Sequence, residues 1–179
     1  TPEIVELAKV AVKYNGVYTT HMRDEGDSVT FAINEALTIG RDAKIPVEIS
    51  HFKLSGQQNW GRSKETVPMI AAARKEGIEV TIDQYPYTAS STSISTLIPD
   101  EILADGQDSI NARLDNPATK KYVIHSMLKR LKKRKLKHFS YAIVSYYQFD
   151  TTYNGKSIEQ INLMRGNKHK KGKEAETIV

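Results

Sequence analysis

Strands and helices alternate along the first half of the chain, and this alternation limits the folds that the sequence can adopt. Residues 17–21, 47–51 and 78–85 are rich in β-branched and aromatic side chains and predict strands. Between them, residues 28–39 and 64–76 repeat apolar side chains at helical spacing. Strands that alternate with helices of this length predict a parallel sheet covered by helices. The predicted fold class is therefore α/β.

Turn-forming residues mark where the helices begin and end. An Asn-Gly pair closes a further helix predicted over residues 2–14. Gly40 is expected to end the second helix and Gly77 the third, since glycine often follows the last helical turn. Ser28 and Ser63 stand where a serine side chain can cap a first turn.

The second half of the chain predicts helices and one more strand. β-Branched and apolar residues over 140–147 predict that strand. Four such strands suit a small open sheet or half of an eight-stranded barrel, and we expect part of a TIM-like (β/α)8 barrel. Helices are expected over 99–105, 109–114, 117–136 and 157–165.

Three parts follow from these elements. Residues 1–98 would hold the βα units, 99–138 a helical insertion, and 139–179 the later strand with helices. The last segment, 172–179, begins like a helix and stops without a cap or turn, as a piece of a longer chain would. No apolar stretch approaches the roughly 20 residues that a membrane-spanning helix needs.

Charge is distributed unevenly along the chain. Residues 1–119 hold 11 Lys and Arg against 17 Asp and Glu, whereas residues 120–179 hold 15 against 4. A basic surface can bind nucleic acid, and the run over 129–137 (KRLKKRKLK) raises that alternative. Apolar residues over 124–131 recur at helical spacing, so we interpret the lysines as the solvated face of an amphipathic helix. We expect no nucleic-acid partner.

Two histidines end neighbouring predicted strands. His21 closes the first strand and His51 the second, one βαβ step of 30 residues apart. Active sites of parallel α/β folds gather at the carboxyl ends of strands, and adjacent strands lie about 4.8 Å apart. The two imidazoles can therefore converge on one metal ion. A catalytic zinc normally takes three protein ligands plus water, and a chain without cysteine offers no thiolate, so further ligands must come from elsewhere.

The sequences around these histidines resemble a known enzyme family. Residues 20–27 (THMRDEGD), 50–53 (SHFK), 59–61 (NWG) and 83–87 (DQYPY) resemble, in order and spacing, barrel strands five to seven of the N-acyl-D-amino-acid deacylases (D-aminoacylases). Residues 154–157 (NGKS) resemble the same branch of the amidohydrolase superfamily. The resemblance covers most of the chain and implies a central fragment of the catalytic barrel, with strands five to seven and a following strand.

What the resemblance implies is a hydrolase that removes the acyl group from small N-acyl-D-amino acids. His21 and His51 would bind zinc, of which the whole enzyme would hold one or two ions. The family's remaining ligands and its catalytic aspartate match no residue of this chain, so no catalytic residue is assigned here. The fragment by itself is expected to be inactive and could lack zinc.

Substrate-binding residues also follow from the resemblance. The family binds the substrate carboxylate with the lysine of its His-x-Lys motif, which implies that role for Lys53; a solvated lysine is the alternative. Tyr85 resembles a substrate-contacting tyrosine, with packing before Pro86 as the alternative. Ser91, or the adjacent Ser90, resembles a further substrate contact in a serine-rich loop.

The loop after the first histidine is expected to support the site. Arg23, Asp24 and Glu25 would orient an imidazole through a carboxylate, and a surface salt-bridge cluster is the alternative. The other histidines lie in basic helical or terminal segments without metal-ligand spacing, and we interpret them as surface residues: His125, His138 and His169.

A second enzyme class remains open, since a dihydroorotase-like or hydantoinase-like hydrolase of cyclic amides would share the barrel and the zinc histidines. Exposed barrel edges predict a homo-oligomer of such a fragment. We expect no membrane partner. A cytoplasmic location is slightly favoured, and a periplasmic one would require a signal ahead of this segment.

Overall fold

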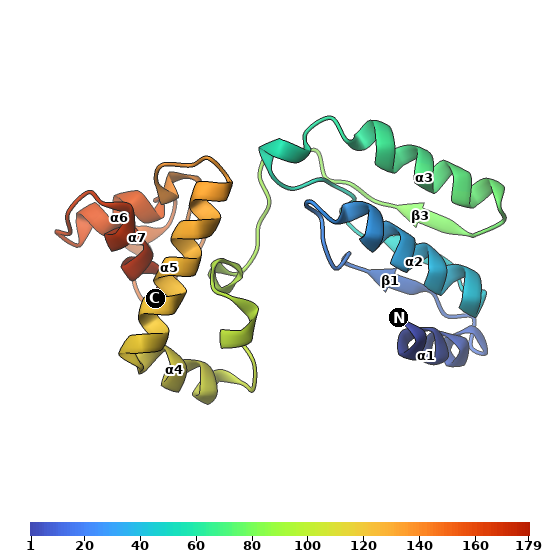
Figure 1. Ribbon diagram of the computed structural model, residues 1–179, viewed down its shortest axis with the longest axis horizontal. Coiled ribbons are helices and arrows are strands. Elements are labelled where there is room, and N and C mark those ends of the chain that lie inside the picture. Colours follow the sequence, from blue (N-terminus) through green and yellow to red (C-terminus); the bar gives the residue numbers. More distant parts are fainter. The chain divides into compact units, whose positions relative to one another are not determined.

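Three short parallel strands organise the first 88 residues of the computed structural model, which describes residues 1–179. They pair in the order β1-β2-β3, with Tyr18 beside Val47 and Val47 beside Val80. The strands are β1 (Tyr18–Thr20), β2 (Val47–Ile49) and β3 (Val80–Ile82), and the helices are α1 (Pro2–Val12), α2 (Val29–Ala43) and α3 (Ser63–Lys75), with a 3-10 turn η1 (Gln57–Asn59) before α3 (Figure 1). The α/β prediction is confirmed for this unit.

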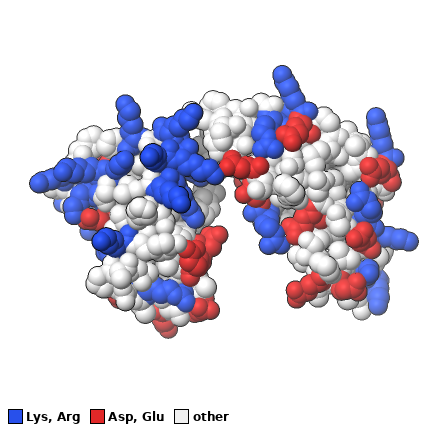
Figure 2. All heavy atoms as spheres, in the orientation of Figure 1, with Lys and Arg blue, Asp and Glu red and all other residues white.

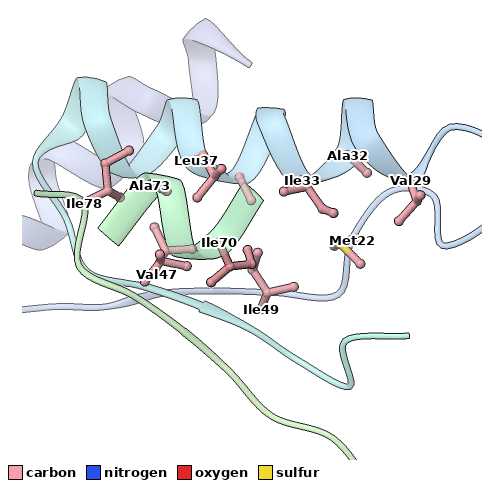
Figure 3. Packing of buried hydrophobic residues seen from close by; sticks show 12 residues of the cluster. Met22, Val29, Ala32, Ile33, Leu37, Val47, Ile49, Ile70, Ala73 and Ile78 are labelled. Carbon is pink, nitrogen blue, oxygen red and sulfur yellow. The ribbon is translucent and has the colours of Figure 1, made fainter. Parts of the chain in front are cut away.

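The core of this first unit lies between the strands and the helices. Apolar residues recur on one face of α2 and pack against β2 and α3, as Figure 3 shows for Ile33, Val47 and Ile70. All three are at most 3% exposed. On the other side of α2, Ile39 packs against Val5 of α1. Burying such side chains contributes about 1.5–3 kcal/mol each, so this packing holds the strands against the helices.

The second helix continues past Gly40, where the sequence pattern predicted its end. It runs to Ala43 and stops at Lys44, which adopts a left-handed conformation with φ 56°. A Cβ atom added at Gly40 would lie 2.5 Å from Cγ2 of Val47. The glycine therefore allows α2 to approach β2 closely, and the turn that ends the helix lies four residues later.

Neither predicted serine caps its helix through its side chain. Ser28 occupies the position before α2 but makes no side-chain cap bond; its backbone N–H donates to the carboxylate of Asp24 over 3.1 Å. Ser63 is already the first residue of α3, which follows Arg62. The start of α2 is thus tied to the loop that follows β1.

The second unit, Ala89–Val179, is built from helices and turns. Asn116 begins its longest helix by accepting backbone hydrogen bonds from Ala118 and Thr119. Ser157 and Gln160 form a capping box on a later helix. Its elements are η2 (Ile94–Leu97), η3 (Asp100–Ile102), α4 (Gln107–Asp115), α5 (Pro117–Lys133), η4 (Phe139–Tyr141), η5 (Thr151–Tyr153), α6 (Ile158–Met164) and α7 (Lys171–Ile178).

The prediction of a fourth strand over 140–147 is wrong. This segment forms the turn η4 and a single antiparallel bridge between Ile143 and Ser157. Val144 donates to the carbonyl of Lys156 over 2.9 Å and accepts from Gly155 over 2.7 Å, but no neighbouring strand continues the ladder. Alternating apolar residues favour an extended backbone, and only a partner strand turns an extended backbone into a sheet.

The interpretation of the basic run is confirmed in part. The basic residues over 129–133 lie on the solvated face of α5, which ends at Lys133, and residues 134–137 follow the helix. In α5, Val123, Met127 and Leu131 are at most 2% exposed and pack against Phe139. On the visible face of the second unit, Lys and Arg gather over the upper part and Asp and Glu lie on the lower part, whereas in the first unit the two kinds of charge are interspersed (Figure 2). No helix of the structure is long and apolar enough to cross a membrane.

Candidate metal centre

The sheet brings His21 and His51 to its carboxyl edge. His21 directly follows β1, and His51 lies two residues after β2, whose Ile49 pairs with Thr20. Ser50 donates to the carbonyl of Thr20 over 3.0 Å and keeps the two chain segments together beyond the last paired residues. Both imidazoles therefore leave neighbouring strands at the same edge.

The two imidazoles point nitrogen atoms at each other. Nδ1 of His21 and Nε2 of His51 are in direct contact, and the ring centroids are 4.4 Å apart with planes inclined by 30°. His21 is exposed, and the His51 side chain is 26% exposed, so the pair can be reached from solvent. Imidazole nitrogens are common ligands of zinc, and their convergence fits a shared metal ion.

The backbone at His51 has an unusual conformation. Its φ is 42°, in the left-handed region that few residues other than glycine adopt. The carboxylate of Asp83, the first residue after β3, accepts the His51 backbone N–H over 2.6 Å. Phe52 donates to the Asp83 carbonyl over 2.9 Å. The third strand thereby holds the turn that aims the second imidazole.

A carboxylate and an ammonium group lie behind the second imidazole. Oε1 of Glu25 is 2.9 Å from Nδ1 of His51, and Nζ of Lys53 is 2.8 Å from the same nitrogen. Lys53 also donates to Oε1 of Glu25 over 2.7 Å. With its Nδ1 engaged, His51 presents Nε2 toward His21. A carboxylate on the far nitrogen is the usual support of a metal-bound histidine.

The predicted supporting loop divides into different contacts. Glu25 reaches the imidazole of His51, whereas Arg23 pairs with Glu35 of α2 over 2.9 Å. The hydrogen bond from Arg23 lowers the pKa of the Glu35 carboxyl, and one from Thr1 adds to this. Asp24 accepts backbone N–H groups of its own loop. Only the last of the three predicted residues contacts a histidine.

The predicted substrate-binding residues are found in both units. The ammonium of Lys53 lies 5.7 Å from the centroid of the Tyr85 ring, within the range of a cation–π contact. Tyr85 in turn stacks on Tyr87 with centroids 6.3 Å apart. Ser91 is an exposed residue of the second unit.

Asn59 and Ser55 also support the site, although the sequence did not predict a role for either. Asn59 is 3% exposed and donates to the Asp27 carboxylate over 3.2 Å and to the Ser55 carbonyl over 2.8 Å. Ser55 donates its N–H to the carbonyl of Glu25 over 2.7 Å. Asn59 thus fixes the two loops that carry Glu25 and Lys53. In the sequence, the only sign of this role was that Asn59 is the first residue of the NWG motif.

Comparison with known proteins identifies the relatives of this chain. A D-aminoacylase from Alcaligenes xylosoxydans xylosoxydans is 44% identical over 110 residues, which are 62% of this chain and 22% of that protein. An N-acyl-D-glutamate deacylase from the same organism is 39% identical over 115 residues, 64% of this chain and 22% of its own. The chain is therefore a relative of the N-acyl-D-amino-acid deacylases. No protein-family model matches it.

Solved structures of deacylases agree with this relationship. A D-aminoacylase described as defining a novel subset of amidohydrolases is 27% identical and matches 99% of this chain and 28% of its own, with a TM-score of 0.63. An N-acyl-D-glutamate deacylase from Bordetella bronchiseptica, solved with zinc and a phosphonate inhibitor, is 27% identical over 99% of this chain and 29% of its own, with a TM-score of 0.62. The chain thus spans less than a third of these deacylases.

The other three histidines differ in their surroundings. His125 is exposed on α5 and His169 is exposed, as predicted, whereas His138 is partly buried. The sequence analysis found no metal-ligand spacing at these positions. In the structure, however, His138 and His169 lie together with Glu159 and Glu174, and their ligand atoms are all within 4.8 Å of one another. The sequence positions gave no signal because the four residues come from separate segments of irregular spacing.

Proposed function

We propose that the protein to which this chain belongs hydrolyses the amide bond of N-acyl-D-amino acids with the help of zinc. The observation that carries the proposal is the convergence of the His21 and His51 imidazoles at one edge of a parallel sheet. The deacylases named above support the substrate class. Within the proposal, β1, β2 and β3 correspond to strands five, six and seven of a (β/α)8 barrel.

His21 and His51 would hold the metal through the two facing nitrogens. When bound, zinc supplies a water of lowered pKa and polarises the amide carbonyl. Glu25 would keep Nδ1 of His51 engaged so that Nε2 carries the free electron pair. Asp83 would hold the strained turn at His51 in place, so that the ligand geometry is formed before substrate binds.

Lys53 would bind the carboxylate of the substrate. Its ammonium lies beside His51, and its side chain is only 19% exposed. The ammonium already contacts Glu25 Oε1, His51 Nδ1 and the His51 carbonyl, so a substrate carboxylate would replace one of these three partners. Tyr85 would contact the substrate through its ring or hydroxyl beside Lys53. Ser91 remains a proposed further contact.

The isolated 179 residues should be inactive. A catalytic zinc normally needs three protein ligands and a group that accepts the proton of the attacking water. The described site offers two imidazoles, and its carboxylates at Glu25 and Asp83 are occupied by Lys53 and by a backbone N–H. Release of amine from an N-acetyl-D-amino acid by this chain alone would contradict that reasoning.

The test uses a full-length protein that contains this chain. Free amine is measured from N-acetyl-D-amino acids, their L-enantiomers and cyclic amides, with zinc and after chelation. We expect zinc-dependent turnover of the D-compounds, lost in His21→Ala and His51→Ala and retained in the control His125→Ala, which lies on α5. Turnover of cyclic amides alone would replace the proposed substrate by the second class of amidohydrolase. Undiminished turnover in both histidine variants would reject the proposed metal ligands.

A further inference from the structure

A second group of possible metal ligands lies in the second unit. His138 precedes η4, Glu159 is in the first turn of α6, His169 lies in the loop between α6 and α7, and Glu174 is in the first turn of α7. One ligand atom from each lies within 4.8 Å of the other three. Four separate segments of the chain therefore bring two imidazoles and two carboxylates to one place.

The contacts inside this group are short. Nδ1 of His138 is 2.6 Å from Oε1 of Glu174 and 3.6 Å from Oε1 of Glu159. Nε2 of His169 is 2.5 Å from the same oxygen of Glu159. The two rings stack with centroids 4.3 Å apart and planes inclined by 18°. Each imidazole thus turns a nitrogen toward a carboxylate oxygen at the centre of the group.

The composition of the group suits a divalent cation. It contains two carboxylates and no lysine or arginine. Glu174 is 0% exposed, and a buried carboxylate needs a partner of opposite charge. A divalent cation bound by the four groups would supply that charge where their ligand atoms converge.

Supporting contacts hold the ligands in position. Oε2 of Glu174 accepts the backbone N–H of Phe139 over 2.8 Å, which leaves Oε1 for the centre of the group. Asn162, also 0% exposed, donates to the carbonyl of Lys168 over 3.0 Å and accepts from Thr177 over 3.2 Å. Asn162 therefore fixes the loop that carries His169 to both α6 and α7. Such second contacts are typical of residues that bind metals.

We propose that His138, Glu159, His169 and Glu174 bind one divalent zinc-type ion. Imidazole and carboxylate donors suit zinc, and four protein ligands make a closed site of the structural kind. The ion would join η4, α6 and α7, which are short elements in a unit without a sheet. The surrounding surface is rich in lysine, so a general attraction of cations does not account for binding there (Figure 2). Retention of zinc would therefore indicate binding by these four side chains.

The experiment separates this site from the proposed catalytic one. The 179-residue chain carrying His21→Ala and His51→Ala is dialysed against zinc and then against metal-free buffer, and the bound metal is measured by mass spectrometry. We expect about one zinc per chain. Adding His169→Ala or Glu174→Gln should reduce this to near zero. The matched controls, His125→Ala and Glu176→Gln, should retain it, because His125 is on α5 and Glu176 pairs with Lys173.

A spectroscopic measurement checks the same ligands independently of stoichiometry. Cobalt in place of zinc should give the visible absorption of a tetrahedral site in the control variants and lose it in His169→Ala. His169 is exposed, with 53% of its side chain accessible, so its replacement should leave the fold intact, which circular dichroism verifies. The proposal is overturned if the chain with both upstream histidines replaced retains no zinc. It is equally overturned if His169→Ala binds as much zinc as His125→Ala.

Discussion

Replacing Gly40 with alanine should destabilise the first unit, although alanine is ordinarily the better residue inside a helix. Gly40 lies in α2 opposite β2, and a Cβ atom built there lies 2.5 Å from Cγ2 of Val47 and 3.3 Å from Cγ2 of Ile78. Carbon atoms pack at about 3.5–4.0 Å, so helix and strand must separate by roughly 1 Å. Val47 is 1% exposed and β-branched, so its side chain has few other rotamers with which to avoid this contact.

The expected magnitude is the difference between two opposing effects. Overpacking a well-packed core costs about 1–3 kcal/mol. Replacing glycine by alanine inside a helix stabilises the helix by about 1 kcal/mol. Because the clash involves a stiff buried side chain, we expect the upper part of the first range and a net loss of about 1–2 kcal/mol in the free energy of unfolding. The same displacement would move β2, which carries His51.

Urea unfolding followed by circular dichroism measures this loss of stability. Two further variants test whether the loss comes from the contact with Val47. Gly172→Ala is the matched control, since nothing lies within 4 Å of a Cβ at that helical position of α7, and it should not destabilise. Val47→Ala removes the obstructing methyl group. The double variant Gly40→Ala/Val47→Ala should therefore lose at least about 1 kcal/mol less than the sum of the single losses. The proposed clash between residue 40 and Val47 would be refuted if Gly40→Ala stabilised the protein as much as Gly172→Ala does. It would also be refuted if the loss in the double variant equalled the sum of the losses in Gly40→Ala and Val47→Ala.

Three further predictions concern the first unit. Asp83→Ala removes the acceptor of the His51 N–H, so calorimetry should show zinc binding by the full-length protein weakened about 10–100-fold. Asp83→Asn keeps an oxygen acceptor and should lose less zinc affinity. Equal losses of affinity in the two variants would contradict this. Glu25→Gln should lower kcat/KM by a similar factor, and the exposed control Glu65→Gln should leave it unchanged. Glu35 has a lowered pKa, so Glu35→Gln should reduce the free energy of unfolding at pH 7. That difference should shrink as the pH falls below the ordinary glutamate range, and a constant difference down to about pH 3 would refute it.

The alternation of strands and helices could be predicted because it depends on local patterns. Apolar side chains at helical spacing on α2 must be buried, and β-branched segments on either side provide the surface that covers them. The position of His21 and His51 followed from the same pattern, since parallel neighbours end at one edge. That Nδ1 of one ring would face Nε2 of the other was not predictable. It depends on the left-handed turn at His51 and on Asp83, more than thirty residues away.

Errors arose where tertiary context overrides a local signal. Gly40 has the composition signal of a helix end, but the space that it leaves is filled by Val47 from the next strand. The segment over 140–147 has the alternation of a strand, but its neighbours offer a single bridge. In both places the deciding contact joins two different elements, and a periodicity argument within one element does not include such a contact.

The group around Glu174 shows the same limit for function. A metal-ligand pattern is read from sequence when the ligands share a helix face or a hairpin, because the backbone then fixes their spacing. Here the ligands come from the start of η4, the first turns of two short helices and the loop between them. Their approach depends on burial of Phe139 and Ala175 against α5, which brings the two short helices and η4 together. A site of this kind depends on the packing of the unit, so substitutions in that core should weaken metal binding without touching a ligand.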